Sequence, residues 1–397
     1  MTDFHSFRER AAALDASDPL AGFRSAFVLD PDVVAYLDGN SLGRLPRRTQ
    51  ERLARFVREE WGGRLIRGWS EGWVDLPVTV GDEVGALLGA APGQTVVADS
   101  TSVCLAKALH AAVSLAPGRD RLVVSAADFP TDRYLARRVA ADRGLAIVEV
   151  DDLGTAIDER TAVVLVSHVD YRTGALLDLP GLTARAHADG AVVVWDLCHS
   201  AGVVPIDLDA SGADLAVGCT YKYLNGGPGS PAFLYAAARH HARLEQPLPG
   251  WWSADDLFAM ADEYRPAAGI RRMLTGTPPV AGLLAVREGV ALAAEAGVAA
   301  ARVKSEALTS FCIEMLDALG LEVVTPRDPA RRGSHVTVRL ADARAIAERL
   351  TERGVIPDFR EPDLVRLGLA PLTTSFTELV DGLSMLAEVL DQVGPLD

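Results

Sequence analysis

Hydrophobic residues between positions 121 and 220 gather into short runs, and segments of mixed polarity separate these runs. The runs predict buried strands, and the intervening segments predict helices near 131–143 and at 180–189. The predicted strands are Arg121–Ser125, Leu145–Val150, Ala162–Ser167, Ala191–Trp195 and Leu215–Cys219. This alternation predicts the α/β class, with a mostly parallel sheet covered by helices and with ligands bound at the carboxyl ends of its strands.

A second pattern, a one-sided apolar stripe, precedes this region. Its positions recur at helical spacing and are Leu53, Phe56, Val57 and Trp61. The stripe predicts a helix that opens at Pro46 and ends at Gly62–Gly63. Val96–Ala98 then predicts a strand, followed by a turn at Asp99–Ser102 that caps a helix beginning near Val103.

The amino-acid composition changes after Pro279, where the chain becomes rich in Ala, Val, Leu and Glu. This region predicts one or two helices over 281–320. A capping box at Ser375 and Glu378 predicts the start of a last helix. Between them the pattern predicts strands at Leu321–Thr325, His335–Arg339 and Leu364–Leu369 and a helix at Ala341–Arg353. We therefore expect an N-terminal arm at 1–45 that joins the small domain, a large domain at 46–280 and a smaller α+β domain at 281–397.

Composition narrows the class of protein. The chain has 397 residues, 49% of them hydrophobic and 23% charged, which is a globular composition. Its net charge of −15 argues against nucleic acid or an anionic membrane as the main partner. The four cysteines form no C-x-x-C pair, so we expect no metal site and free thiols in a reducing compartment. Charges near the N-terminus and the lack of a run of about 20 apolar residues predict a cytoplasmic protein.

Candidate chemistry lies where two predicted strands end. Asp196 closes the run Val192–Trp195, and Lys222 lies between the apolar run that ends at Cys219 and a Gly-rich turn. An anion for a pyridinium nitrogen and an amine for a Schiff base are what pyridoxal phosphate requires from its protein. An arbitrary Asp and Lys pair is far more often a solvated loop Asp and a surface Lys, so the surrounding sequence must decide.

Collinear motifs along nearly the whole chain, from about residue 36 to 376, supply that context. They are Tyr36–Gly43, Asp99–Val103, Asp128–Tyr134, Tyr171–Gly174, Val192–Gly202, Thr220–Gly229, Gly250–Trp252, Gly276–Pro279 and Asp358–Asp363. Through these motifs the chain resembles the kynureninase family, in the aminotransferase class V branch of the fold-type I pyridoxal phosphate enzymes. The resemblance implies a large domain with a mostly parallel sheet and a smaller C-terminal α+β domain.

The resemblance also implies four catalytic residues. Lys222 would carry pyridoxal phosphate as a Schiff base and then move protons. Asp196 would pair with the pyridinium nitrogen, so that the ring can accept negative charge. His199 would flank the ring, although an isolated His in a polar turn is more often structural. Tyr221 would contact the phosphate and relay protons.

Five further residues would complete the cofactor pocket. Thr101 and Ser102, at a helix N-terminus, would bind the phosphate. Phe129 would stack on the ring, and Asp132 and Ser167 lie at or just past predicted strand ends that converge on the same pocket.

Residues farther along the chain would bind the substrate or reach a second subunit. Arg366, with Arg360 as a second candidate, would bind the α-carboxylate, although either could be a surface Arg. Trp69 would lie at the substrate pocket or simply pack in the core. Trp251 would reach the cofactor of the partner subunit and Thr277 would lie near the substrate ring, which implies a working homodimer.

The implied reaction is hydrolysis of the Cβ–Cγ bond of L-kynurenine to anthranilate and L-alanine, in tryptophan catabolism and NAD biosynthesis. Three departures from the family pattern, at Trp252–Ala254, Thr373 and Cys104, lie outside the cofactor chemistry. They imply an altered aryl pocket that also accepts 3-hydroxykynurenine or another ring-substituted kynurenine.

Two alternatives differ in class. One is another class V activity, namely a cysteine desulfurase, a selenocysteine lyase or an aminotransferase, and a desulfurase would need a nucleophilic Cys on a mobile loop. The other is a regulator that binds pyridoxal phosphate without catalysis, for which a DNA-binding extension or basic region would be expected. The sequence contains neither.

Overall fold

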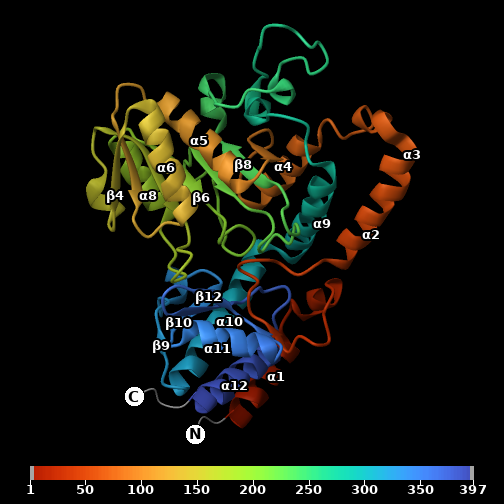
Figure 1. Cartoon of the computed structure of the whole chain (residues 1–397), viewed down its shortest axis with the longest axis vertical. Coiled ribbons are helices and arrows are strands. Elements are labelled where there is room, and N and C mark those ends of the chain that lie inside the picture. Colours follow the sequence, from red (N-terminus) through yellow and green to blue (C-terminus); the bar gives the residue numbers. More distant parts are fainter. Residues whose placement is uncertain (1–3, 394–397) are drawn as a thin grey trace.

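Two lobes, one above the other in Figure 1, make up residues 4–393, the part of the chain that this computed structural model describes. The upper lobe is built on a seven-stranded sheet and the lower lobe on a four-stranded sheet. None of the helices within residues 4–393 is long and apolar enough to cross a membrane.

The seven-stranded sheet has the order β2-β8-β7-β6-β5-β3-β4. Its strands are β2 (Thr95–Ala98), β3 (Arg121–Ser125), β4 (Ala146–Val150), β5 (Thr161–Ser167), β6 (Val192–Asp196), β7 (Leu215–Gly218) and β8 (Ala232–Ala236). Only β8 runs in the direction opposite to the other six strands. The α/β class with a mostly parallel sheet is therefore confirmed. The sequence analysis missed β8, because a short uniformly apolar run has no period that separates strand from helix.

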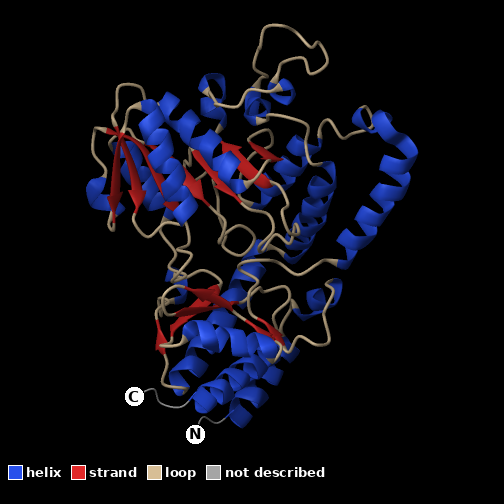
Figure 2. Cartoon of the chain, viewed as in Figure 1, coloured by secondary structure: helices blue, strands red, loops and turns tan. Residues whose placement is uncertain are grey.

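Helices cover both faces of this sheet (Figure 2). In chain order, the helices of the upper lobe are α2 (Arg47–Arg55), η2 (Phe56–Trp61), α3 (Gly62–Arg64), η3 (Leu65–Trp69), α4 (Leu76–Leu87), α5 (Thr101–Leu115), α6 (Pro130–Arg143), α7 (Leu153–Ala156), α8 (Leu179–Ala188), η4 (Ala238–Arg243), η5 (Trp251–Ser253) and η6 (Gly269–Met273). The segment from α2 to α3 forms an arm that stands away from the sheet (Figure 1). The helix expected to stop at Gly62–Gly63 instead continues through them to Arg64 by way of a π-helical turn. It ends at Leu65, whose positive φ of 56° breaks the helical path.

The lower lobe combines the N-terminal arm with the C-terminal third. Its elements are α1 (Phe4–Ser17), η1 (Ala21–Ala26), β1 (Ala35–Tyr36), α10 (Val298–Ala318), β9 (Glu322–Val323), η7 (Pro329–Arg331), β10 (His335–Arg339), α11 (Ala343–Glu352), β11 (Val355–Ile356), β12 (Asp358–Arg360), β13 (Leu364–Gly368) and α12 (Phe376–Val393). The antiparallel sheet has the order β12-β13-β10-β9, and β1 pairs with β11. Side chains of α1 and α12 share one core, with Phe7 and Leu379 among its members.

The expected capping box of α12 is only half formed. Ser375 Oγ accepts a hydrogen bond from the Glu378 backbone N–H at 3.0 Å, as a cap should. The Glu378 carboxylate does not return to the cap, because it accepts from the Tyr36 backbone N–H at 2.9 Å and from Arg44 at 2.9 Å. Glu378 therefore fastens the N-terminal arm to the first turn of α12.

Helix α9 (Val280–Ala296) joins the two lobes and is separated from α10 by Gly297, whose φ of 79° favours glycine. Leu283 and Val290 of α9 pack in the core of the upper lobe, whereas Leu308 of α10 packs in the lower lobe. The domain limits drawn from the sequence remain a prediction, and this packing leads us to propose Gly297 rather than residue 280 as the junction.

Each lobe holds a cysteine deep in its core. Cys104 lies among the residues between α5 and the large sheet, and Cys312 lies on α10. Burial raises the pKa of the Cys104 thiol to about 12 and also raises the pKa of Cys312. All four cysteines are free.

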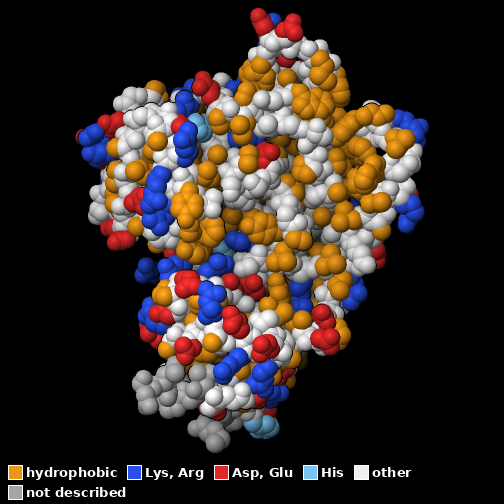
Figure 3. Space-filling view, in the orientation of Figure 1, with side chains coloured by type: hydrophobic (Ala, Val, Ile, Leu, Met, Phe, Trp, Pro, Cys, Tyr) orange, Lys and Arg blue, Asp and Glu red, His pale blue; other side chains and the backbone are white. Residues whose placement is uncertain are grey.

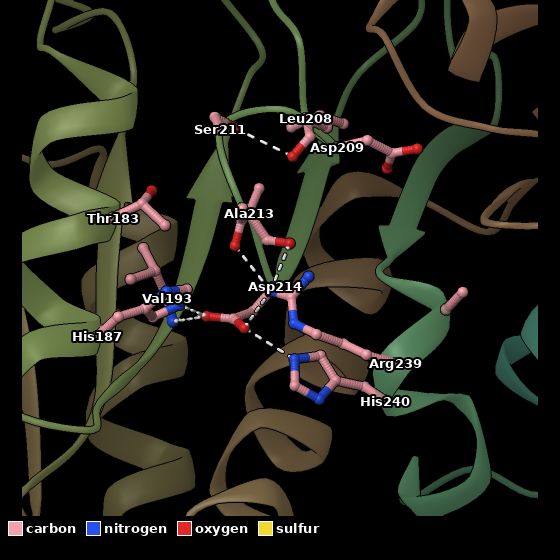
Figure 4. A network of polar contacts seen from close by, with 12 residues as sticks. Thr183, His187, Val193, Leu208, Asp209, Ser211, Ala213, Asp214, Arg239 and His240 are labelled. Atoms are coloured by element: carbon pink, nitrogen blue, oxygen red, sulfur yellow. Dashed lines mark hydrogen bonds and ion pairs between the residues drawn. The ribbon is translucent and has the colours of Figure 1, made fainter.

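A polar network closes the amino-terminal ends of β6 and β7, opposite the carboxyl ends at which we expect ligands (Figure 4). Asp214, buried just before β7, accepts hydrogen bonds at 2.8 Å from both His187 and His240 and at 2.7 Å from Arg239. It also accepts from the Val193 backbone N–H at 2.9 Å. Burial acts to raise the pKa of Asp214, but the two histidines outweigh it and hold the pKa below its usual range. The carboxylate thereby ties α8, β6 and η4 together.

Candidate active site

The carboxyl ends of β5, β6 and β7 converge on one pocket. Ser167 and Asp196 are direct partners in the register of β5 and β6, and Lys222 follows β7 in the next turn. Nine of the expected site residues line this pocket: Thr101, Ser102, Phe129, Asp132, Ser167, Asp196, His199, Tyr221 and Lys222. Residues far apart in sequence are therefore brought together because parallel strands end at one edge of the sheet.

Lys222 lies against His199, with 3.0 Å between Lys222 Nζ and His199 Nε2. Burial lowers the pKa of His199 well below its usual value, and the positive charge of Lys222 lowers it further. The imidazole is therefore neutral at physiological pH, so it can accept or donate one proton beside the amine.

The turn that carries Lys222 is held by the N-terminal motif. The Gly43 backbone N–H donates to the Tyr221 carbonyl at 2.7 Å. A Cβ at Gly43 would lie 2.3 Å from the Lys222 carbonyl oxygen, so only glycine permits this approach. This close contact explains physically why a glycine stands at the end of the Tyr36–Gly43 motif.

Two carboxyl groups form the base of the pocket. Asp196, the last residue of β6, accepts from the Cys198 backbone N–H at 2.6 Å. Asp132, in the first turn of α6, is almost fully buried. Burial raises the pKa of Asp132 well above its usual value, and the nearby carboxylates of Asp196 and Asp128 raise it further. Two close carboxyl groups favour sharing one proton, and here the protonated form of Asp132 is favoured.

The amino end of α5 contributes hydroxyl groups at the opposite wall. Thr101 begins the helix, two residues earlier than expected, and Ser100 Oγ caps it by accepting from the Val103 N–H at 3.4 Å. The hydroxyls of Thr101 and Ser102 and the free N–H groups of the first turn face a pocket that suits an anion. Lys107 stabilises the turn before the helix through an ion pair, with its Nζ 2.6 Å from Asp99 Oδ2.

An aromatic face borders the pocket mouth. Phe129, at the start of α6, is 39% exposed. Its ring makes an edge-to-face contact with Tyr171 at a centroid distance of 5.1 Å. Tyr171 fixes the orientation of Phe129 while leaving part of that ring free to stack on a planar ligand.

Arg366 reaches the same region from the lower lobe. It is 1% exposed, its Nε donates to Asp358 Oδ2 at 2.6 Å, and it also donates to Ser41 Oγ at 3.2 Å and to the Tyr171 carbonyl. Arg360 donates to the same oxygen of Asp358 at 3.0 Å and is more exposed. The structure thus brings Arg366 to the pocket wall through Tyr171, but neither arginine is among the lining residues.

Besides the two arginines, three expected residues lie outside this pocket. Trp69 packs edge-to-face on Trp252 at 5.2 Å, in the upper core. Trp251 packs on the same Trp252 at 4.6 Å and lines a separate surface groove, and Thr277 is exposed just before α9. Within the single chain, residues 4–393, none of these three therefore reaches the pocket around Lys222.

Thr373, one of the three departures from the family pattern, also lies outside the residues that line the pocket. Thr373 is buried, and its carbonyl accepts from Arg24 of the N-terminal arm. The expectation that Thr373 opens the aryl pocket is not supported by this placement.

Several lining residues escaped the sequence analysis. They are Leu105, Thr131, Val169, Tyr171 and Cys198. Tyr171 and Cys198 each belong to a motif named in the sequence analysis, but neither was assigned a role. Their positions close to the ends of predicted strands were the signal that could have placed them in the pocket. His335, whose ring centroid lies 5.4 Å from that of His199, gave no signal because its contact arises from packing of the two lobes.

The pocket therefore combines an amine, a neutral imidazole, a pair of carboxyl groups, hydroxyls at a helix N-terminus and an aromatic face. A planar ligand with an anionic group at one end and a basic ring nitrogen at the other would find a partner for each part. The amine could bond covalently to a carbonyl carbon of such a ligand.

Comparisons with known proteins agree with this arrangement. The family model described as "Kynureninase C-terminal domain" matches residues 301–386. A kynureninase of Pseudomonas fluorescens is 45% identical over 399 residues, which cover 97% of this chain and 96% of that protein.

Solved structures resemble the chain in fold. An apo cysteine desulfurase of Thermococcus onnurineus superposes with a TM-score of 0.81 at 19% identity, over 94% of this chain and 98% of that one. A C-DES variant with glycine covalently linked to its PLP cofactor has a TM-score of 0.78 at 19% identity, over 89% of this chain and 96% of that one. At these identities the likeness establishes the fold, which is that of the fold-type I pyridoxal phosphate enzymes.

Proposed function

Because this chain belongs to the kynureninase family, we propose that its pocket hydrolyses the Cβ–Cγ bond of L-kynurenine, giving anthranilate and L-alanine. The chain is thus a hydrolase of the kynureninase type that uses pyridoxal phosphate. The observation that carries this proposal is the convergence of Lys222, Asp196 and the amino end of α5 on one pocket.

The pocket residues fit pyridoxal phosphate part by part. Thr101 and Ser102 would hold the phosphate at the amino end of α5. Asp196 would face the ring nitrogen, and Phe129 would cover one face of the ring. Asp132 Oδ2, buried in this pocket, has no hydrogen-bond partner among residues 4–393, as expected of a group that faces a polar ligand.

When bound, pyridoxal phosphate withdraws electrons from the substrate Cα, which makes both the Cα–H and the Cβ–Cγ bond labile. Lys222 would remove the Cα proton, since its Nζ is the amine that lines the pocket. His199, neutral and 3.0 Å from that amine, would hold it in position and exchange protons with it. Asp196 would keep the ring nitrogen protonated as negative charge develops.

Arg366 would bind the substrate α-carboxylate, because a guanidinium matches a carboxylate in shape and charge. Hydrolysis consumes one water, whose oxygen enters the anthranilate carboxylate while Cβ of alanine gains a proton. Burial raises the pKa of Tyr221, so its hydroxyl stays protonated and could donate that proton.

A cysteine desulfurase activity is disfavoured by the thiols. Cys198 alone of the four lines the pocket within residues 4–393. A hydrogen bond with Cys219 raises the pKa of Cys198 well above its usual value, and burial raises it further, so it lacks the thiolate that such chemistry needs.

The working unit would be a cytoplasmic homodimer. Large apolar side chains are exposed on the α2–η3 arm and on the loop after η5: Val57, Trp61, Leu65, Ile66, Phe258, Met260 and Tyr264. Figure 3 displays hydrophobic side chains over both segments. Exposed apolar surface of this kind favours a protein interface. A partner seated there could carry Trp251 and Thr277 toward the second pocket, and sedimentation analysis would measure the mass.

The test is direct. The purified protein with pyridoxal phosphate is expected to convert L-kynurenine to anthranilate, followed by fluorescence, with one L-alanine released per anthranilate. Lys222→Ala should lower turnover by more than about 10³-fold while the thermal unfolding midpoint stays within a few degrees. Lys304→Met, at an ion pair in the lower lobe, is the matched control and should retain activity. Absence of anthranilate with wild-type protein, or turnover by Lys222→Ala, would contradict the proposal.

A further inference from the structure

His335, on β10 of the lower lobe, is fully buried, and neither of its ring nitrogens has a hydrogen-bond partner among residues 4–393. His199, in the upper lobe, has one unpartnered nitrogen as well, Nδ1, while its Nε2 contacts Lys222. The two ring centroids lie 5.4 Å apart with the planes inclined by 56°. Three unpaired nitrogens therefore lie in one small region between the lobes.

Both imidazoles are neutral. Burial lowers the pKa of His335 well below its usual value, and the charges of Arg366, Lys222 and Arg360 lower it further. The same three cations act on His199. Each neutral ring carries one N–H and one lone pair, so each needs one acceptor and one donor. Buried polar groups without partners are costly and are usually satisfied by ordered water.

The contact with Lys222 is compatible with either tautomer of His199, because the amine can donate to Nε2 or, when neutral, accept from it. When Lys222 donates, the proton of His199 lies on Nδ1. That N–H then requires an acceptor. The neighbouring His335 ring makes no direct hydrogen bond with it among residues 4–393.

We propose that His335 positions His199 through one water molecule that bridges the two rings, and thereby fixes the proton of His199 on Nδ1. The ring centroids lie 5.4 Å apart, so a nitrogen of each ring can lie within reach of two hydrogen bonds of about 2.9 Å each that meet at one water oxygen. The water accepts from His199 Nδ1–H and donates to the free lone pair of His335. His335 is thus a positioning residue, and the lower lobe influences the amine pocket through it.

This inference rests on the two rings and on Lys222, so it stands or falls separately from the identity of the substrate. It also explains the neutral state of His335, because a protonated imidazole would have no lone pair to receive the water proton. The charged groups that face the pair are Lys222 from the upper lobe and Arg366 and Arg360 from the lower lobe.

The test uses the full-length protein labelled with ¹⁵N-histidine and freed of cofactor, with His335→Phe and His335→Gln as variants. Phe keeps the ring shape and removes the nitrogens, whereas Gln keeps one donor and one acceptor. In wild type, the His199 resonances should report a proton on Nδ1. In His335→Phe they should shift toward protonation at Nε2, and His335→Gln should restore the wild-type pattern.

His240→Phe is the matched control, since it removes a buried histidine from the Asp214 network and should leave the His199 resonances unchanged. A second readout is the affinity for pyridoxal phosphate, which should weaken about tenfold in His335→Phe and at most about twofold in His335→Gln.

A high-resolution crystal structure of the wild-type protein tests the water itself, even if His335→Phe fails to fold. Density for one water between the rings supports the proposal. Rings in direct contact, or His199 resonances that ignore His335→Phe, would overturn it.

Discussion

Arg366 and Asp358 lie directly opposite each other on neighbouring antiparallel strands, and Arg366 Nε donates to Asp358 Oδ2 at 2.6 Å. The same oxygen also accepts from Arg360 at 3.0 Å. One carboxylate therefore holds two guanidinium groups. Because Arg366 is 1% exposed, its partner fixes the orientation of a buried cation before any substrate carboxylate arrives.

We predict that Arg366→Lys raises KM for L-kynurenine about tenfold or more and lowers kcat less. A lysine supplies a point charge but loses the planar pair of donors. Arg360→Lys is the matched control, because it bonds the same Asp358 from a more exposed position. Steady-state kinetics decide, and a larger effect from Arg360→Lys would transfer the carboxylate role to Arg360.

Asp196→Asn should lower kcat by about 10²-fold or more with a modest change in KM. Its interaction with the ring nitrogen is stronger in the transition state than in the ground state. The cofactor content of the variant, measured by absorbance, separates lost chemistry from lost cofactor. An unchanged kcat with full cofactor would remove Asp196 from the mechanism.

Asp128 should make the wild-type protein less stable as the pH rises. Burial raises its pKa to about 7 in the folded state, against about 3.9 in the unfolded chain. The folded state therefore binds more protons between about pH 4 and 7, and its stability falls across that window and then levels. Asp128→Asn can still accept from the Ser167 N–H, which lies 3.0 Å from Oδ1.

Denaturant unfolding of this variant should give a gain of about 1–3 kcal/mol over wild type at pH 8 and little gain at pH 4. Asp151→Asn, at an exposed neighbouring carboxylate, is the control and should give no pH-dependent difference. A constant difference across the range would mean that Asp128 does not titrate as described.

Asp214→Ala should lower the free energy of unfolding by about 3–5 kcal/mol, because it leaves two histidines and an arginine without their shared partner. Activity of the folded fraction should change less than about twofold, since the network lies at the opposite end of the sheet. The folded-state pKa of Asp214 is depressed. Its contribution is therefore complete above the unfolded value of about 3.9 and is lost as the pH falls below it. The difference between the two proteins should shrink by pH 3, which chemical unfolding at several pH values would measure.

The substrate range should be broad. We expect L-kynurenine and 3-hydroxy-L-kynurenine both to be hydrolysed, with kcat/KM values within about two orders of magnitude. A small change in an apolar pocket alters binding by only about 1–3 kcal/mol. Thr373→Tyr should leave this ratio unchanged, because Thr373 lies beside Arg24 rather than in the pocket. A stronger preference would reveal a hydrogen bond that reads the ring hydroxyl.

The parts of the fold that the sequence predicted best are those with an uninterrupted local pattern. The limits of β3 and β10 match the predicted strands, because both are continuous apolar or alternating runs. Two- and three-residue strands such as β1 and β12 are too short to show a hydrophobic period. They exist because they pair with β11 and β13, which lie elsewhere in the chain or across a turn. Gly62–Gly63 misled the prediction because glycine lowers helix propensity without preventing a helix that neighbouring turns sustain.

The residues of the candidate site also differ in whether a local sequence pattern predicts them. The placement of Asp196 and Lys222 in one pocket was predictable, because each lies where a readable strand ends and parallel strands bring their ends together. The Asp358–Arg366 pair, the Phe129–Tyr171 contact and the approach of His335 to His199 depend on register and on how the lobes meet. No local pattern encodes such contacts, so the residues could be nominated from the sequence but their partners could not.

Cys104 in the upper lobe and Cys312 in the lower lobe can each report when the core around it becomes exposed to solvent. A thiol must become a thiolate and meet solvent before it can be alkylated, and burial denies both to Cys104 and Cys312 in the closed protein. Pulsed alkylation followed by peptide mass analysis would therefore time the exposure of each core separately, without any introduced label. The order in which the two peptides gain mass would reveal which lobe unfolds first, and whether bound cofactor delays the upper lobe alone.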